Sequence, residues 1–209
     1  PGKVVILGGG VVGTEAAKMA LGLGANVTIL DRDLYRLRAL ENLFGPRLKT
    51  LYSTSSSIEE SLKEADLVIG AVLIPGKTAP KLVTKEMIKK MRKGAVIVDV
   101  AIDQGGCMET SRPTTHANPI YEVDGVVHYC VTNMPGACAR TSTLALTNAT
   151  AEYALMIANK GWKQALNDHA GLRDGLNVCD GLVTNESVAH DLGYPYVPAE
   201  TLVKTEEND

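Results

Sequence analysis

A glycine-rich turn between an apolar strand and a helix places the strongest constraint on the fold of this chain. Residues 4–13 read VVILGGGVVG, a four-residue apolar run followed by the spacing G-x-G-x-x-G at Gly8, Gly10 and Gly13. In this pattern the first glycine permits a tight turn, the second lets a pyrophosphate approach bare backbone, and the third lets the helix pack on the strand. Residues 14–23 carry the spacing of that helix. The motif indicates a dinucleotide-binding unit.

An acidic residue follows the second strand at the place where such a unit binds ribose. Residues 26–30 read NVTIL and predict that strand, and Asp31 comes directly after it. A carboxylate here accepts hydrogen bonds from the adenosine ribose and repels a 2′-phosphate, which favours NAD over NADP. The alternative is a glycine turn in an unrelated α/β protein, with Asp31 capping the next helix.

Strand and helix patterns alternate over the first 130 residues. This alternation predicts a parallel sheet with helices on both faces, the doubly wound Rossmann architecture. The expected strands are 4–7, 27–30, 48–52, 66–70, 95–100 and 125–131, and the expected helices include 14–23, 34–43, 58–65 and 84–91. Ligands bind beyond the carboxyl ends of such strands. One edge of the sheet should therefore hold Gly8–Gly13, Asp31, Ser53, Val72–Leu73, Asp103 and Asn133.

The pattern changes after residue 140. Residues 141–159 predict a long helix with an apolar or small-residue stripe that includes Leu144 and Leu155. A short helix at 162–166 and an extended segment at 176–184, with a turn at Asp180-Gly181, follow. We therefore expect two domains: 1–137, a Rossmann domain, and 138–209, the helical C-terminal part of an incomplete second domain. An uncovered stripe would favour self-association or a missing partner.

Composition narrows the classes of partner. The net charge of −3 and the absence of a basic run argue against nucleic acid and against an anionic membrane. No apolar run approaches the length of a membrane span, and no signal peptide is evident, so we expect a cytoplasmic protein. The chain opens with Pro1 instead of Met, as if cut. The four cysteines have neither zinc nor C-x-x-C spacing, so free thiols and no metal site are expected.

Two stretches carry a more specific signal than the glycine motif. Residues 98–107 read VDVAIDQGGC and residues 131–137 read VTNMPGA, with SRPTTH at 111–116. Together they closely resemble alanine dehydrogenase, and the resemblance extends from Pro1 to about Val203. The related NAD-binding subunit of proton-translocating transhydrogenase has the same architecture. Its loop after strand five differs from residues 102–106, so we place it second.

The resemblance implies reversible, NAD-dependent oxidative deamination of L-alanine to pyruvate and ammonia in a homo-oligomer, commonly a hexamer. Asp103 matches the family's catalytic aspartate, which binds the amine or activates water beside the nicotinamide; from pattern alone it could equally cap a loop. The implied cofactor-binding residues are Gly8, Gly10, Val11, Val12, Gly13, Asp31, Arg36, Ser53, Val72, Leu73, Val100, Asp103, Asn133 and Met134.

Several of these residues also have a plain structural interpretation. Arg36 could be a solvated helix residue, Ser53 part of a helix-capping loop, and Met134 a packing residue. Arg112 and His116 suit the binding of a carboxylate and acid–base work, but neither is assigned as a primary catalytic residue; His116 lies in a predicted loop, where a histidine is more often incidental.

The resemblance does not extend to the family's substrate half, which precedes the nucleotide domain and supplies an arginine, a lysine and a catalytic histidine. Three hypotheses therefore stay open. The chain is part of an alanine dehydrogenase whose N-terminal half is a separate or absent chain, a non-catalytic NAD-binding module, or a related enzyme such as transhydrogenase.

Overall fold

The computed structural model describes residues 1–72 and 78–203. Within them the chain divides into two compact units, one formed by 1–72 with 78–134 and the other by 135–203. We call them the nucleotide unit and the C-terminal unit and describe each by itself. The division into two domains predicted from the sequence, 1–137 and 138–209, remains a prediction.

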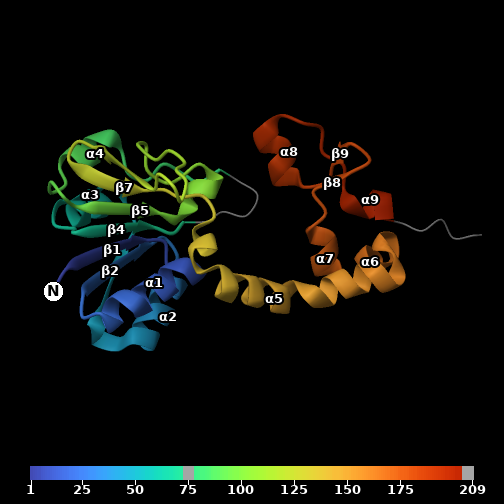
Figure 1. Cartoon of the computed structure of the whole chain (residues 1–209), viewed down its shortest axis with the longest axis horizontal. Helices are drawn as coiled ribbons and strands as arrows, with labels where there is room; N and C mark the ends of the chain where they lie inside the picture. Colours follow the sequence, from blue (N-terminus) through green and yellow to red (C-terminus); the bar gives the residue numbers. More distant parts are fainter. Residues whose placement is uncertain (73–77, 204–209) are drawn as a thin grey trace, which may run out of the picture. The chain divides into compact units, whose positions relative to one another are not determined.

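A seven-stranded sheet forms the centre of the nucleotide unit (Figure 1). Its strand order is β3-β2-β1-β4-β5-β7-β6, and every neighbouring pair is parallel except β6 with β7. The reversal of order on either side of β1 is that of a doubly wound Rossmann sheet, so the predicted fold class is confirmed. The strands are β1 (Lys3–Leu7), β2 (Asn26–Asp31), β3 (Leu48–Tyr52), β4 (Leu67–Gly70), β5 (Val96–Asp99), β6 (Ile120–Val123) and β7 (Val126–Tyr129).

Helices cover both faces of this sheet. Successive side chains of a strand point to opposite faces, and β1 shows this directly: Ile6 packs in the core under α1 and α2, and Leu7 in the core under α3 and α4. Parallel strands covered on both faces read as continuous apolar runs, which is why the sequence pattern was informative. The helices are α1 (Val11–Gly22), α2 (Leu34–Phe44), the short η1 (Gly45–Arg47), α3 (Ser55–Lys63) and α4 (Lys85–Lys89).

Several element limits differ from the predictions, and one strand was not predicted. Helix α1 begins at Val11 instead of residue 14, because Gly10 itself is the N-cap. Strand β5 ends at Asp99, and Val100–Gln104 form the 3-10 turn η2 instead of continuing the strand. The segment before β7 is also a strand, β6, which pairs antiparallel through a turn at Asp124-Gly125 with φ of 52° and 82°. The sequence Asp-Gly between short strands is a hairpin signal that could have predicted it.

The C-terminal unit is mainly helical. It contains most of η3 (Met134–Cys138), then α5 (Ala139–Lys160), α6 (Trp162–Asp168), α7 (Ala170–Asp174), β8 (Val178–Cys179), β9 (Leu182–Val183), α8 (Glu186–Leu192) and α9 (Ala199–Val203). The predicted helices at 141–159 and 162–166 and the turn at Asp180-Gly181 are confirmed. Short α7, α8 and α9 were not predicted.

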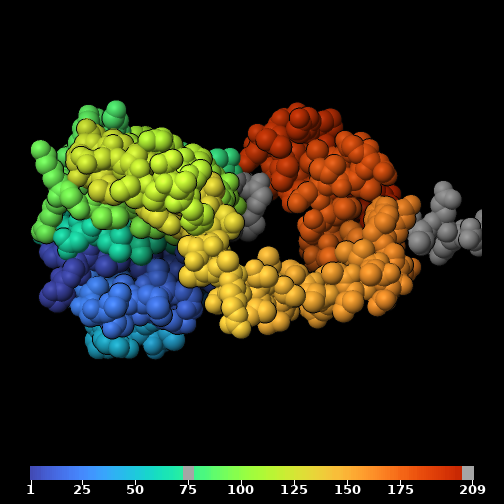
Figure 2. Space-filling view, viewed as in Figure 1, coloured from blue at the N-terminus to red at the C-terminus, as the bar shows by residue number. Residues whose placement is uncertain are grey.

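Helix α5 has no buried residue. Leu144 and Leu155 of the predicted stripe are 52% and 61% exposed, and Figure 2 shows side chains of this helix open on the side in view. The stripe is therefore present but uncovered in this chain. Across residues 1–72 and 78–203, no helix combines the length and apolar character needed to cross a membrane.

Candidate functional site

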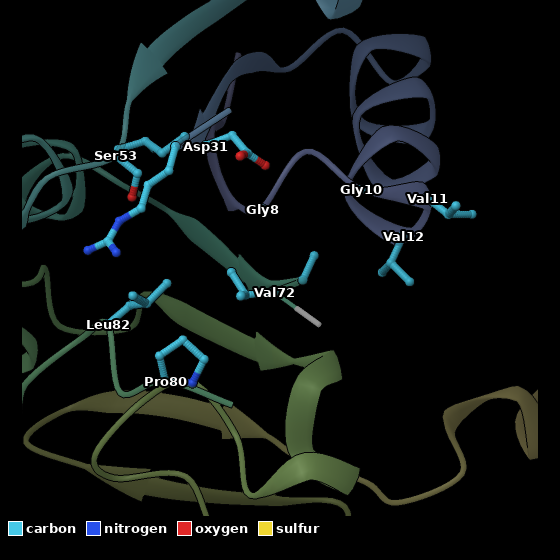
Figure 3. Close-up of a pocket in the computed structure, with 12 residues that line it drawn as sticks. Gly8, Gly10, Val11, Val12, Asp31, Ser53, Val72, Pro80 and Leu82 are labelled. Carbon is cyan, nitrogen blue, oxygen red and sulfur yellow. The ribbon is translucent and has the colours of Figure 1, made fainter. Parts of the chain in front are cut away.

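A cavity of about 490 Å³ lies at the carboxyl ends of β1, β2, β3 and β4 in the nucleotide unit (Figure 3). This is the edge at which doubly wound sheets bind their ligands. Seven residues predicted from the sequence line it: Gly8, Gly10, Val11, Val12, Asp31, Ser53 and Val72. Five lining residues were not predicted: Leu30, Arg32, Ala71, Pro80 and Leu82.

The three motif glycines meet different steric demands. A Cβ on Gly8, whose φ is 99°, would lie 2.8 Å from the carbonyl oxygen of Ala71 after β4. A Cβ on Gly13 would lie 1.9 Å from the carbonyl oxygen of Gly8, so that α1 packs directly against the turn. A Cβ on Gly10 would meet nothing within 4 Å. Gly8 and Gly13 therefore allow the tight turn, and Gly10 presents bare backbone to open space.

The N-terminus of α1 opens onto this cavity without a side-chain cap. Gly10 is the N-cap, no side-chain hydrogen bond caps the helix in the described structure, and its first turn holds no acidic residue. The first backbone N–H to be paired within the helix is that of Thr14, 3.0 Å from the carbonyl oxygen of Gly10. Uncapped N–H groups and the positive end of the helix dipole form a site for an anion such as a pyrophosphate.

Asp31 lies at the end of β2 and faces the cavity beside the glycine turn (Figure 3). One carboxylate oxygen accepts a hydrogen bond from the Gly9 N–H at 2.6 Å, and the other accepts from the Asp33 N–H at 2.9 Å. A carboxylate offers about four acceptor positions, so two remain for ligand hydroxyl groups. Arg32 also lines the cavity and brings a positive charge next to this carboxylate.

Arg36 holds the glycine turn from outside the cavity. Its guanidinium donates hydrogen bonds to the carbonyl oxygens of Gly9 and Gly10 and, at 2.6 Å, to the hydroxyl of Thr14. These bonds fix the carbonyl side of the turn and so orient its backbone. The structure thus gives Arg36 a positioning contact, and a contact of Arg36 with adenosine stays a prediction.

Four further predicted residues lie at the same edge of the sheet but do not line this cavity. Val100 and Asp103 are in η2 after β5, with Asp103 exposed. Asn133, exposed with φ of 56°, and half-buried Met134 follow β7. Leu73 lies outside the described residues.

The two residues left unassigned are engaged in local contacts. His116 pairs through Nε2 with the carbonyl oxygen of Asn133 at 3.1 Å. The guanidinium of Arg112 stacks 4.0 Å over the ring of Tyr121. Neither lines the cavity.

Of the five lining residues that were missed, Leu30, Arg32 and Ala71 directly adjoin predicted residues, and their place within or just after apolar runs could have indicated them. Pro80 and Leu82 come from the segment before α4, and no sequence signal places that segment across the cavity from Gly8 (Figure 3).

Two buried cysteines near the end of β5 are not nucleophiles. Burial and the adjacent carboxylate of Asp99 raise the pKa of the Cys107 thiol far above its usual range. Burial also raises the pKa of Cys130. Because the thiolate is the reactive form, both thiols stay protonated and inert.

A family profile described as "Alanine dehydrogenase/PNT, C-terminal domain" matches residues 1–186. The chain belongs to this family. It is 61% identical to an alanine dehydrogenase of Bacillus subtilis over 208 residues, covering 99% of this chain and 55% of the relative. It is 57% identical to one of Halomonas elongata over 203 residues, covering 97% of this chain and 55% of the relative. The chain thus spans about half the length of these relatives.

Solved structures agree with this placement. An L-alanine dehydrogenase superposes with a TM-score of 0.83 and 56% identity, covering 92% of this chain and 53% of that one. A transhydrogenase from Sinorhizobium meliloti superposes with a TM-score of 0.69 and 27% identity, covering 89% of this chain and 50% of that one. The resemblance to alanine dehydrogenase that the sequence predicted is therefore confirmed.

Proposed function

We propose that this chain is the NAD-binding part of an alanine dehydrogenase, which converts L-alanine, water and NAD to pyruvate, ammonia and NADH. The observation that carries the proposal is the cavity in which an uncapped helix N-terminus and the carboxylate of Asp31 face the same space. The identity of 61% to the relative from Bacillus subtilis supports the choice of enzyme.

The residues around the cavity fit a dinucleotide. The open space at Gly10 and the N–H groups of the first turn of α1 would hold the pyrophosphate. The free acceptor positions of Asp31 would bind the adenosine ribose. Ser53, whose N–H donates to the carbonyl oxygen of Asp31 at 2.9 Å, would lie beside that ribose. These are contacts for NAD, because the carboxylate repels a 2′-phosphate.

When bound, NAD supplies the acceptor for the hydride that leaves the alanine Cα. Oxidation of the amine gives an imine, whose hydrolysis releases ammonia and pyruvate, and we assign Asp103 to accept the proton of the water that adds to the imine. Its side chain is exposed at the carboxyl edge of the sheet, close to Gly105 and Gly106, whose φ values are 89° and 75°. An exposed carboxylate at this edge can reach a ligand that extends beyond the cavity.

Transhydrogenase is the second candidate, and its lower sequence identity argues against it. The L-alanine dehydrogenase structure shares 56% of its aligned residues with this chain, whereas the transhydrogenase shares 27%. A non-catalytic NAD-binding module is the third candidate. A chain of this kind would bind NAD but would not oxidise alanine, even when joined to the rest of an alanine dehydrogenase.

We also propose that another protein surface covers part of the C-terminal unit. The exposed apolar side chains of α5 are the kind of surface that another part of the enzyme or another copy of the chain covers. A homo-oligomer in the cytoplasm remains our expectation.

A chimera tests the proposal. The part of the Bacillus subtilis relative that this chain does not match is joined to residues 1–209, and NADH formation is followed with NAD and L-alanine at alkaline pH. We expect alanine-dependent NADH formation that Asp103→Asn lowers by at least about 100-fold. The exposed Asp124, in the β6–β7 turn, provides the matched control Asp124→Asn. A chimera that binds NADH without turnover would support the non-catalytic module instead.

A further inference from the structure

A buried carboxylate organises the backbone that follows β5. Asp99 is completely buried, and its carboxylate accepts hydrogen bonds from the N–H groups of Ala101 at 3.1 Å and Cys107 at 2.8 Å and from the hydroxyl of Ser111 at 2.5 Å. The Met108 N–H is a more distant donor at 3.4 Å. No ion pair within the described residues includes Asp99. The loop after β5 therefore supplies the hydrogen-bond donors for this carboxylate. Both ends of the loop are hydrogen-bonded to one buried group.

Two glycines make room for this carboxylate. A Cβ on Gly70 at the end of β4 would lie 2.8 Å from one oxygen of Asp99, and a Cβ on Gly106 would lie 2.7 Å from the other. Gly106 also has φ of 75°, which favours glycine. The close approach of the carboxylate to the loop is thus built into the local backbone.

A lysine holds the same loop by its carbonyl groups. The ammonium of Lys81 donates hydrogen bonds to the carbonyl oxygens of Gly105 at 2.5 Å and Gly106 at 2.8 Å. Asp99 takes the N–H of the next residue, Cys107. Lys81 and Asp99 therefore bind opposite poles of the peptide group between Gly106 and Cys107, and Lys81 also binds the carbonyl of the preceding peptide group, close after Asp103 and Gln104.

The segment around Lys81 also closes the cavity. Pro80 and Leu82, its two neighbours, line the cavity across from the glycine turn (Figure 3). Their backbone is joined to the loop as well, since the Ala79 N–H donates to the Gln104 carbonyl and the Leu82 N–H donates to the Cys107 carbonyl, each at 2.8 Å. One segment thus contacts both the cavity and the loop that carries Asp103.

We propose that Lys81 and Asp99 are positioning residues that hold residues 103–108 in place, and that the segment 79–82 couples occupation of the cavity to the position of Asp103. The second half of this proposal rests on NAD binding in the cavity. A ligand that packs against Pro80 and Leu82 restrains Lys81, and Lys81 in turn restrains the loop.

Hydrogen exchange of the backbone amides in the 209-residue chain tests this proposal. In Lys81→Met, without ligand, we expect the amides of 105–108 to exchange about tenfold faster or more, because two charge-assisted hydrogen bonds are lost. Amides in β1 and β2 should exchange as in the unsubstituted chain. Lys81→Arg should restore slow exchange, since a guanidinium also donates to carbonyl groups. Lys85→Met is the matched control, because the Lys85 ammonium takes no part in the bonds to the loop.

Addition of NADH tests the coupling. In the unsubstituted chain, bound NADH should slow exchange at 105–108, and in Lys81→Met this slowing should be lost while NADH fluorescence still reports binding. Exchange at 105–108 that is unchanged in Lys81→Met, or equally changed in Lys85→Met, would overturn the positioning role. Slowing by NADH that survives in Lys81→Met would overturn the coupling. If the unsubstituted chain binds no NADH, the proposed function is contradicted. The exchange measured without ligand would still decide the positioning role of Lys81.

Discussion

Substitution of Asp31 by alanine should change both the affinity and the preference of the cavity. The carboxylate already accepts N–H donors from Gly9 and Asp33 at 2.6 Å and 2.9 Å, so its free acceptor positions are fixed in direction. Hydrogen bonds to a charged group contribute about 1.5–3 kcal/mol. Loss of the ribose contacts should therefore raise the Kd for NADH about 10- to 100-fold.

The same substitution should lower the Kd for NADPH relative to the Kd for NADH. Two charges about 4 Å apart repel by about 1 kcal/mol in water and about 4 kcal/mol near a protein surface. Removing this repulsion leaves Arg32 in the cavity wall as a partner for the 2′-phosphate. The ratio of the NADPH and NADH dissociation constants should therefore fall by about 50-fold or more.

Fluorescence titration of the 209-residue chain with NADH and with NADPH measures this ratio. Asp31→Asn keeps an acceptor for the Gly9 N–H and loses the charge, so it separates the loss of repulsion from any loosening of the turn. Asp124→Asn, in the exposed β6–β7 turn outside the cavity lining, is the matched control and should leave the ratio unchanged. Equal dissociation constants in the unsubstituted chain and in Asp31→Ala would refute the role of Asp31 in ribose recognition.

Three further results are expected. Gly13→Ala places a Cβ 1.9 Å from the Gly8 carbonyl oxygen, so the free energy of unfolding by urea should fall by about 3 kcal/mol or more, and a loss below about 1 kcal/mol would contradict the packing. Arg36→Met should weaken NADH binding about tenfold by freeing the glycine turn, with little change in the NADPH to NADH ratio; a changed ratio would indicate contact with the adenosine instead. Burial lowers the pKa of His128 from 6.5; Arg112 adds to this shift and Asp99 opposes it. Below about pH 6.5 the unfolded state therefore binds more protons than the folded state. The free energy of unfolding should therefore be highest above pH 6.5 and fall as the pH decreases from there, and His128→Gln should flatten this slope.

The strands of the sheet could be predicted because burial on both faces leaves a continuous apolar run. Strand β6 was missed because Ile120–Val123 lies at the sheet edge and has no buried residue, so its sequence shows no continuous apolar run. The short helices α7, α8 and α9 were missed for a similar reason. Each has five to seven residues and depends on tertiary packing more than on a periodic pattern.

The site was predictable on the side that the glycine motif forms. The spacing of Gly8, Gly10 and Gly13 corresponds to steric contacts within the strand–turn–helix unit itself, and local sequence reports local contacts. The opposite wall depends on Pro80 and Leu82, which are placed by backbone hydrogen bonds to residues more than 20 positions away. The direction of Arg36 likewise depends on how α2 packs beside the turn, which residue type and position alone do not determine.

The most direct measurement of the central claim is the change in backbone amide chemical shifts of the 209-residue chain when NADH is added. We predict saturable shifts at residues 8–13, 31–32, 53, 79, 81 and 82, and much smaller shifts at the same NADH concentration in Asp31→Ala. Absence of shifts in the unsubstituted chain, or shifts confined to residues outside the cavity lining, would contradict the account.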